Sequence, residues 1–371
     1  MTTEHLRTLD DLDRRLDGYR NVTDADLRGR DDCYIVEGAR IVARFLHAAH
    51  TAHTAHTAHV AHAAHTAHAA HTAHAAHAAH AAHAAHAAHA AHAAHTAHTA
   101  HTAHAAHTTL TDGGLRHAHP AMAIEPLSVL LGDEVATSAD GRRIIELSER
   151  LARAGAPHPV FIAPQAEVTR LSGYRLHHGA LALGRRHAEA TVQDLLGADP
   201  PPRTIVCLER VVHTDNVGSI FRTMGSLEST PAILLASDSS DPLLRKCIRV
   251  SSGRVFATSW ARSGAGRWLD DLRALRAAGC ALVAAEHADS AEHMARSTSP
   301  ARLRARIDAT QRLAIVIGAE GDGVGKDTLA LCDHIVEIPM RPAAGLLADD
   351  DHPSLNAAVA AAMVVGALGV D

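Results

Sequence analysis

The chain contains 371 residues, which is enough for two domains with separate hydrophobic cores. A formal net charge of −6 with neutral histidines disfavours, taken alone, a nucleic-acid-binding protein. The 5 cysteines form no Cys-x-x-Cys pair, so the sequence disfavours a zinc ribbon and a disulfide framework and predicts buried thiols in a reducing cytoplasm. The first 20 residues are charged throughout and the apolar run at 357–368 is too short to span a bilayer, so we expect a cytoplasmic protein without a membrane segment.

Basic residues are concentrated in one part of the second half of the chain. Between Arg245 and Arg276 there are eight basic residues and two acidic ones, a local charge of +6. Such a segment can contact the phosphates of a nucleic acid. The sequence is equally compatible with a solvated helix face over Arg267 to Arg276.

The first predicted elements belong to a small α/β unit. Residues 1–30 are rich in aspartate and arginine and predict a leading helix and a turn. The run Cys33 to Gly38 predicts a short strand. A helix is expected to follow from about Ala39, with apolar side chains at Ile41, Val42, Phe45 and Leu46.

That helix continues into a low-complexity repeat. From His47 to His107 every third residue is histidine, 21 in all, separated mostly by Ala-Ala or Thr-Ala. A three-residue step advances about 300° around an α-helix, so the histidines wind around the axis and leave no apolar stripe for packing. We expect either an exposed helix, roughly 90 Å long if continuous at about 1.5 Å per residue, or a fluctuating one.

Three interpretations of the repeat stay open. Neighbouring imidazoles can share a Zn²⁺, Ni²⁺ or Cu²⁺ ion, so adventitious metal binding is the first. The second is a polycation that contacts RNA below about pH 6.5. The third is a tandem repeat expanded in a surface loop without a role, because long insertions in such loops cost little. In each case the repeat is expected to be dispensable for chemistry, since it lies far in sequence from the polar segments described next.

After the repeat, strands and helices alternate, which is typical of an α/β domain. The predicted elements are strands at 127–131, 158–162 and 178–183 and an amphipathic helix at 142–154. Residues 188–202 end in Ala-Asp-Pro-Pro-Pro and predict a stiff linker.

A strand-to-helix turn carries the first group of polar residues in the second half. The β-branched run Thr204 to Leu208 predicts a buried strand. Asp215 and Asn216 are good N-cap residues, and apolar residues at positions 217, 220, 221 and 224 give one face of a helix. Asn216 and Arg222 are thus carried on a turn of the kind where function concentrates in α/β folds.

Two later segments repeat the arrangement of a strand followed by a polar loop. The apolar run at 313–317 leads into the glycine-rich loop Gly318 to Gly323. The run at 334–339 leads into a loop that ends at Ser354-Leu355-Asn356, after which an alanine-rich helix is expected over 357–368. The other predicted elements here are strands at 233–236 and 255–258 and a turn and helix over 241–253.

These polar segments form an ordered set of three motifs. They are Asn-x-Gly-x-x-x-Arg (Asn216, Gly218, Arg222), Gly-x-Glu-Gly-x-Gly (318–323), and Ile-Pro-Met (338–340) followed by Ser-Leu-Asn (354–356). Together they resemble the three motifs of the SpoU (TrmH-like) family of SPOUT RNA methyltransferases. The segments around Val36-Glu37-Gly38 and His177 are similar to the L30e-like N-terminal domain of that family. The resemblance therefore covers the chain except for the repeat.

The resemblance implies transfer of the methyl group of S-adenosylmethionine to a ribose 2′-hydroxyl of rRNA or tRNA. By their match to the motifs, the expected catalytic residues are Arg222, Asn216, Glu320, Ser354 and Asn356, and the expected cofactor-binding residues are Gly318, Ile338, Met340 and Leu355, with no metal. Because a guanidinium stays protonated, we expect Arg222 to hold a phosphate or the developing alkoxide. A homodimer is also implied, and the helix at 357–368 suits its interface.

The implied fold is α/β. A C-terminal SPOUT trefoil-knot domain with a mostly parallel sheet is preceded by a small L30e-like α/β domain that carries the histidine-rich insertion. The expected divisions are an N-terminal RNA substrate-binding domain over 1–190, the insertion over 47–109 within that domain, a linker over 191–202, and the methyltransferase domain over 203–371.

One segment departs from the family pattern. Arg341 to Pro353 is longer than the matching loop of relatives and carries three consecutive aspartates. This loop suggests either a lid or a weakened cofactor site. The alternative function is therefore a catalytically weak or inactive RNA-binding or metal-binding protein on the same fold. A metal-dependent enzyme is disfavoured, because a uniform repeat offers no distinct open coordination site.

Overall fold

The computed structural model describes residues 3–6, 14–20, 23–24, 32–58, 124–173, 179–287, 291–308, 310–340 and 355–368. One compact unit comprises residues 1–53 and 118–371, and a second comprises residues 54–117. Most of the histidine repeat lies outside the described residues, as do His177, Ser354 and the loop at 341–353. The described start of the repeat continues the helix of residues 39–58.

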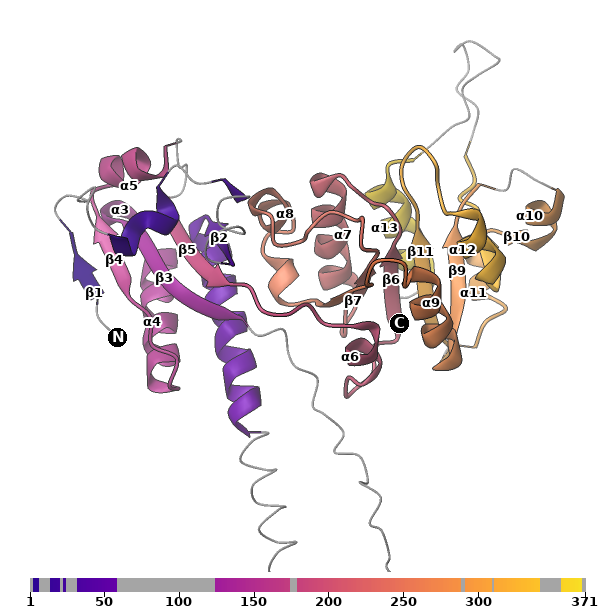
Figure 1. The fold of residues 1–371 in the computed structure, drawn as a ribbon, viewed down its shortest axis with the longest axis horizontal. Coiled ribbons are helices and arrows are strands. Elements are labelled where there is room, and N and C mark those ends of the chain that lie inside the picture. The colour runs from indigo at the N-terminus through magenta and orange to yellow at the C-terminus, as the bar shows by residue number, and fades with distance from the viewer. Residues whose placement is uncertain are drawn as a thin grey trace, which may run out of the picture. The chain divides into compact units, whose positions relative to one another are not determined.

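The first sheet has five strands in the order β1-β4-β3-β5-β2 (Figure 1). The strands are β1 Thr3–His5, β2 Cys33–Glu37, β3 Glu125–Gly132, β4 Val160–Ala163 and β5 Ala180–Arg185. Strand β5 is antiparallel to both β2 and β3, whereas β4 is parallel to β1 and β3. The segments before and after the histidine repeat therefore pair within one sheet.

Helices pack on this sheet through apolar faces. They are the helix of 39–58, α3 Asp133–Ala136, α4 Ala139–Arg153 and α5 Gln165–Ser172. The sequence predicted the helix of 39–58 and α4, but not α3 or α5. In the helix of 39–58, Val42, Phe45 and Leu46 are fully buried, as predicted. In α4 the N-cap Ser138 accepts a hydrogen bond from the backbone of Gly141, which satisfies one of the free N–H groups of the first turn.

The leading helix predicted for residues 1–30 is wrong where the structure describes that segment. Residues 3–5 form the edge strand β1, and Arg14–Tyr19 form a 3₁₀ helix. Tyr19 is buried and its hydroxyl lies 2.7 Å from the Ser128 hydroxyl of β3. Burial of Leu16 and Tyr19 in the core therefore determines the local conformation of this segment. The charged composition, on which the helix prediction was based, does not.

The second sheet has seven strands in the order β10-β12-β9-β11-β6-β7-β8. The strands are β6 Thr204–Leu208, β7 Ala232–Leu235, β8 Ser259–Arg262, β9 Cys280–Ala285, β10 Ser297–Thr298, β11 Arg312–Ile317 and β12 His334–Val336. Every paired neighbour is parallel. The predicted mostly parallel α/β sheet is confirmed, and the trefoil knot stays a prediction.

Helices cover both faces of the parallel sheet (Figure 1). The helices are α6 Val192–Leu196, α7 Thr214–Leu227, α8 Arg245–Val250, α9 Trp268–Ala277, α10 Ala291–Arg296, α11 Pro300–Arg304, α12 Lys326–Leu331 and α13 Ala357–Leu368. Alternate residues of β6 point to opposite faces of the sheet. Val206 and Leu208 therefore join the core beneath α7, α8 and α13, and Ile205 and Cys207 join the core beneath α6, α9 and α12. Burial on both faces explains the uninterrupted apolar runs of the central strands.

Two local predictions in this half are wrong. The strand expected at 255–258 is a 3₁₀ turn, Arg254–Phe256, and β8 begins only at Ser259. Gly253 precedes the turn with a left-handed φ of 74°, and Phe256 is buried against Tyr34, with ring centroids 5.9 Å apart. The helix expected to be capped by Asp215 or Asn216 instead begins at Thr214 with His213 as its N-cap, so Asn216 lies in the first turn.

The cysteines follow the sequence expectation. All 5 are buried and free of disulfides. Burial raises the pKa of Cys247 to about 12, with a smaller contribution from the charge of Asp215. These thiols therefore act as small apolar core groups.

Candidate active site

The three motifs meet at the carboxyl edge of the parallel sheet. Asn216 lies on α7, the helix that follows β6, Gly318 directly follows β11, and Ile338 follows β12. Strand β11 pairs with β6 on one side and β9 on the other, and β12 pairs with β9. Because all these strands are parallel, the loops at their carboxyl ends share one edge, which is where α/β sheets bind ligands.

A cavity of about 210 Å³ lies at this edge. Its lining includes all four residues expected to bind the cofactor, namely Gly318, Ile338, Met340 and Leu355. The expected catalytic residue Glu320 also contributes to the lining. Five of the nine site residues expected from the sequence are thus brought together around one cavity.

The glycine-rich loop of the second motif folds tightly back on itself. A Cβ atom on Gly318 would lie 2.2 Å from the carbonyl carbon of Gly323, so no side chain fits there. Gly323 has a left-handed φ of 63° and donates a backbone hydrogen bond of 2.9 Å to Ala319. This compact turn brings bare backbone to the cavity wall, which lets a ligand approach closely.

Acidic side chains that the sequence did not single out also line this cavity. Glu286 follows β9 and accepts a hydrogen bond of 2.5 Å from the backbone N–H of Val324. His287 lies 2.6 Å from Glu337 through Nδ1 and Oε1. No prediction covered β9, so the residues after that strand could not be connected with the motifs.

The first and third motifs are joined by a side-chain hydrogen bond. Asn356 donates from Nδ2 to Oδ1 of Asn216 over 2.9 Å. The Oδ1 atom of Asn356 accepts a hydrogen bond of 3.0 Å from the backbone N–H of Ala358, in the first turn of α13. Asn356 therefore supports the start of α13 and fixes the buried amide of Asn216 at the same time.

Glu320 is paired with a residue that the motifs did not indicate. Its Oε2 atom lies 3.2 Å from Nε2 of His213, the N-cap residue of α7. The His213 side chain is 69 % exposed, so its ring stays accessible to a substrate. The only sequence signal for His213 was its place three residues before Asn216.

Glu209 and Arg210 connect the end of β6 with the glycine-rich segment. Glu209 accepts hydrogen bonds from the backbone of Gly325 over 3.2 Å and from the hydroxyl of Thr328 over 3.1 Å. Burial raises the pKa of the Glu209 carboxyl, and these hydrogen bonds partly offset the increase. Arg210 donates to the carbonyl of Gly323 over 3.2 Å. The end of β6, which leads to the first motif, is therefore hydrogen-bonded to the end of the glycine-rich loop and to the residues that follow it.

Arg222 lies on a different side of α7 from Asn216. Six residues advance about 240° around a helix at about 100° per residue. Gly218, one turn before Arg222, packs against α8, where an added Cβ would lie 2.8 Å from Val250. Arg222 is exposed, and no carboxylate pairs with it among the residues that the structure describes.

Arg222 belongs to a group of arginines, which we call the arginine cluster: Arg44, Arg222 and Arg254. Partial burial, together with the positive charges of Arg254 and Arg222, lowers the pKa of Arg44. Arg44 donates from Nη1 to the carbonyl oxygen of Ser252 over 2.5 Å and to its hydroxyl over 2.6 Å. The aliphatic part of Arg254 packs against Gly225 of α7. Within the described ranges of the chain, none of these three arginines is paired with a carboxylate, and such a group of cations favours an anionic ligand.

Half of the eight basic residues between Arg245 and Arg276 are neutralised locally. These four cations pair with acids: Lys246 with Asp215, Arg262 with Glu189, Arg273 with Asp270 and Arg276 with Asp333. Arg273 and Arg276 lie on an exposed face of α9, which agrees with the interpretation of that part as a solvated helix face. Arg254 alone among the described residues of this segment belongs to the arginine cluster.

Comparison with known proteins identifies the family. A sequence model described as the SpoU rRNA Methylase family matches residues 203–366. The chain is 34% identical over 224 residues to an uncharacterized tRNA/rRNA methyltransferase of Mycobacterium bovis, in an alignment that covers 60% of this chain and 69% of that one. The chain belongs to the SpoU methyltransferase family. SpoU methyltransferases act on RNA and use S-adenosylmethionine.

Solved structures show the same fold. An AdoMet-bound rRNA methyltransferase from Sinorhizobium meliloti superposes with a TM-score of 0.59 at 16% identity, covering 98% of this chain and 97% of that one. An RNA 2′-O ribose methyltransferase superposes with a TM-score of 0.56 at 17% identity, covering 98% of each chain. These likenesses support the α/β architecture of the SpoU fold. Among the described residues, no helix is both long and apolar enough to cross a membrane.

Proposed function

We propose that this SpoU protein transfers a methyl group from S-adenosylmethionine to a ribose 2′-hydroxyl of rRNA or tRNA. The observation that carries the proposal is the convergence of Gly318, Ile338, Met340 and Leu355 on one cavity, with Glu320 in its lining.

The cavity suits the proposed cofactor. Apolar Ile338 and Leu355 offer a surface for the adenine, and the backbone at Gly318 permits close approach. The carboxylates of Glu286 and Glu337 complement the positive charge of a sulfonium and an ammonium group. When bound there, S-adenosylmethionine supplies an electrophilic methyl group.

The residues of this chain would then position the RNA. Arg222, with Arg44 and Arg254 beside it, holds a backbone phosphate next to the target ribose. Asn216, fixed by Asn356, orients the ribose by hydrogen bonds, and Glu320 is oriented by His213. Correct placement of hydroxyl and methyl group supplies much of the rate in such a displacement. Ser354 is assigned to this site by its motif alone.

The hydroxyl proton needs an acceptor, and a guanidinium is a poor one because it stays protonated. Imidazole exchanges protons near neutral pH. We assign the proton to His213, which lies 3.2 Å from Glu320 at the start of α7. Glu320 would stabilise the imidazolium that forms.

Methyl transfer to ribose can be distinguished from transfer to a base. The purified protein is incubated with labelled S-adenosylmethionine and unmodified rRNA and tRNA transcripts, and the RNA is then hydrolysed with alkali. A 2′-O-methyl group blocks cleavage, so label is expected in dinucleotides. Label in mononucleotides would contradict ribose methylation. Arg222→Ala is expected to lose most activity with RNA saturating, and Arg273→Ala on α9 is the control.

Cofactor binding separates an active enzyme from the alternative of a weak or inactive RNA-binding or metal-binding protein. Calorimetric titration with S-adenosylmethionine is made on the full chain and on a variant lacking residues 48–107. Equal binding by both supports an enzyme with a dispensable repeat. No binding by either would favour the alternative function.

We also propose that the protein is a cytoplasmic homodimer. Val359 and Met363 lie one turn apart on α13 and are 47% and 48% exposed. Large apolar side chains in this arrangement suit contact with a second copy of the chain. Val359→Asp with Met363→Asp is expected to yield monomers in analytical ultracentrifugation. An unchanged mass would remove α13 from the interface.

The repeat is assigned no role in the reaction. In the part of the chain that the structure describes, no group of three or more histidine, cysteine, aspartate or glutamate side chains is arranged to hold a metal ion. Adventitious metal binding by the repeat is tested by Ni²⁺ titration of the full chain and of the variant lacking residues 48–107.

A further inference from the structure

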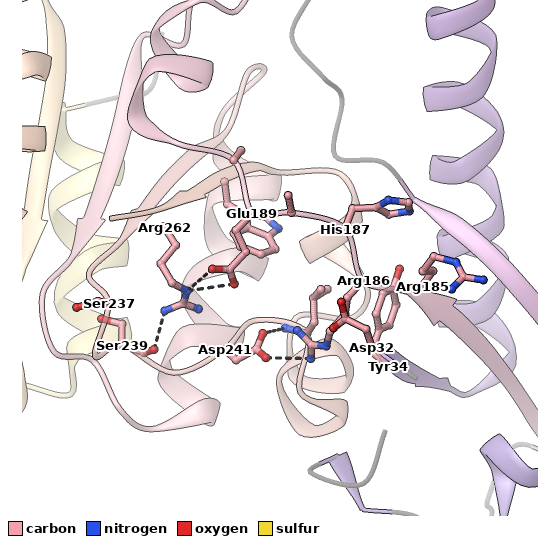
Figure 2. A pocket seen from close by; sticks show the side chains of 14 residues that line it. Asp32, Tyr34, Arg185, Arg186, His187, Glu189, Ser237, Ser239, Asp241 and Arg262 are labelled. Atoms are coloured by element: carbon pink, nitrogen blue, oxygen red, sulfur yellow. Dashed lines mark hydrogen bonds and ion pairs between the residues drawn. The ribbon is translucent and has the colours of Figure 1, made fainter. Parts of the chain in front are cut away.

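A second and larger cavity, of about 440 Å³, shares no lining residue with the cofactor cavity. We call this cavity the ion-pair cavity. Its lining comes from the start of β2, the segment 185–190 after β5, the loop after β7, and β8 (Figure 2). None of its lining residues belongs to the three motifs.

Two ion pairs form the walls of the ion-pair cavity. Arg186 and Asp241 lie 2.9 Å apart, with side-chain exposures of only 10% and 8%. Arg262 lies 3.0 Å from Glu189 and donates to the carbonyl of Ser239 over 2.9 Å. Figure 2 shows both arginines held against their partners at the edge of the cavity. The polar groups are therefore fixed in place before any ligand arrives.

Two aromatic side chains complete the lining. Tyr34 and Trp260 are each 3% exposed. The Tyr34 ring is held by stacking on Phe256, with centroids 5.9 Å apart and an interplanar angle of 27°. The indole N–H of Trp260 has no acceptor among the described residues. The cavity thus combines flat apolar surface with rigid donors and acceptors.

This combination selects the chemical class of the ligand. A bare phosphate is disfavoured, because each wall arginine already faces a carboxylate. A planar heterocycle with alternating donors and acceptors matches guanidinium and carboxylate groups placed side by side, and its faces suit aromatic neighbours. Nucleobases have this chemistry. The volume lies within the range of roughly 300–1,000 Å³ typical of small-molecule sites.

The position of the ion-pair cavity relates it to the candidate active site. The loop after β7 and the end of β8 lie at the same carboxyl edge of the sheet as the motifs, and β7 pairs directly with β6. Neighbouring strands are about 4.8 Å apart, so the two sites are within reach of one RNA strand.

The ion-pair cavity also contacts the active-site loop through hydrogen bonds. Ser239 of the lining donates from Oγ to the carbonyl of Leu208 over 2.8 Å and accepts from the backbone of Val211 over 3.2 Å. The next residue, Ser240, donates to the carbonyl of Val211 over 2.9 Å. Residues 208–211 lead directly to His213 and Asn216. Occupancy of the cavity would therefore hold the loop that carries the first motif.

We propose that the ion-pair cavity binds an unpaired base of the substrate RNA that flanks the methylated nucleotide. This inference rests on the proposed RNA methyltransferase function. The cavity reads a base outside the reaction centre and thereby contributes to the choice of RNA.

A fluorescence experiment tests the inference directly. The chain has 2 tryptophans, Trp260 and Trp268, so Trp268→Phe leaves Trp260 as the single indole reporter in the cavity. In this background the full-length protein is titrated with unstructured oligoribonucleotides, each rich in one of the four bases. Ala188→Phe fills the cavity from an exposed lining position, and Ala277→Phe makes the same exchange at an exposed position on α9.

We expect three results. At least one oligonucleotide changes Trp260 emission, its affinity falls roughly tenfold in Ala188→Phe, and Ala277→Phe leaves that affinity unchanged. Affinity for S-adenosylmethionine, measured by calorimetry, is expected to be the same in both variants. Equal RNA affinity of the two variants would overturn the inference. The inference would also fall if free adenosine or S-adenosylmethionine gave the Trp260 change and the oligonucleotides did not, because the site would then bind a free nucleoside.

The same variants distinguish a failure of this inference from a failure of the proposed function. Methyl transfer to RNA by the wild-type chain is measured in parallel. If Ala188→Phe transfers methyl groups to RNA as efficiently and as selectively as the wild-type chain, the ion-pair cavity is not an RNA subsite, and the proposed enzyme function still stands. Absence of any transfer by the wild-type chain defeats the proposed function and, with it, the inference.

Discussion

Asn356 donates a 2.9 Å hydrogen bond from Nδ2 to Oδ1 of Asn216, across 140 positions of the sequence. The same asparagine accepts a hydrogen bond from the backbone of Ala358 in the first turn of α13. One side chain therefore supports the start of the C-terminal helix and orients a buried polar group of α7. Stability and site geometry are coupled at this pair.

Substitution of Asn356 is expected to affect both properties. Asn356→Ala removes the cap and leaves the Asn216 amide without this donor, which is expected to cost about 1–2 kcal/mol of unfolding free energy. Asn356→Asp keeps an acceptor for Ala358, so about half of that loss should be recovered. Urea denaturation of both variants and of Asn216→Ala measures the effect. Additive losses in the Asn216→Ala/Asn356→Ala double variant would show that the two amides do not interact.

The glycine-rich loop provides a matched pair of substitutions. Gly318→Ala places a Cβ about 2.2 Å from backbone atoms of Gly323, so the loop must open. Gly321→Ala meets nothing within 4 Å. We expect Gly318→Ala to weaken binding of S-adenosylmethionine at least tenfold in calorimetry and Gly321→Ala to bind nearly as the wild type. Similar losses in both would mean that flexibility of the loop, and not the close backbone approach, governs binding.

The sequence predicts those elements whose pattern is set locally or by burial on both faces. The bounds of β6 and α13 agree with the expected Thr204–Leu208 and Ala357–Leu368, because both are uninterrupted apolar runs between polar boundaries. Strand β9 was not predicted, since Cys280–Ala285 contains three alanines and carries little β-branched signal. The 3₁₀ turn at 254–256 was missed because it depends on the tertiary burial of Phe256.

Some residues of the candidate site could likewise be predicted from the sequence, and others could not. Gly318, Ile338, Met340 and Leu355 could be selected by motif and do line one cavity. Glu286 and His213 could not be selected, because their contacts with Val324 and Glu320 join segments that no local pattern relates. The ion-pair cavity was invisible in the sequence for the same reason, since the partners Arg186 and Asp241 come from segments on either side of β6.

The arginine cluster predicts a salt-dependent contribution to RNA binding. Arg44 lies in the helix of residues 39–58, outside the family match at 203–366, yet its charge acts together with those of Arg222 and Arg254. Arg44→Ala should weaken RNA binding and reduce the slope of log K against log salt by roughly 0.7–0.9, the value for one phosphate contact. Filter binding at several salt concentrations measures this slope. Arg273→Ala, which removes an exposed cation paired with Asp270, is the control.

His158 is expected to make stability depend on pH. Burial lowers its pKa from the ordinary value of 6.5, and its Nε2 atom lies 3.0 Å from the Ser148 hydroxyl. As the pH falls below about 6.5, the unfolded chain takes up a proton that the folded imidazole does not. The contribution of His158 to the unfolding free energy is therefore complete above that pH and declines below it. His158→Asn cannot titrate. Its unfolding free energy should therefore fall less than that of the wild type between pH 7.5 and pH 5.5, and an identical fall in both would exclude His158 as the source.

The pairing of His213 with Glu320 predicts that His213 contributes to the chemical step. If the imidazole at the start of α7 accepts the hydroxyl proton, its replacement should slow methyl transfer at saturating substrates. His213→Gln keeps a side-chain donor for Glu320 but cannot accept the proton, so we expect the maximal rate to fall about 10²–10⁴-fold, the usual contribution of general base catalysis. Single-turnover methyl transfer measures this rate. His5→Gln, which alters an exposed imidazole on β1, controls for the loss of a histidine elsewhere. A full rate in His213→Gln would leave the proton to another acceptor and limit His213 to orienting Glu320.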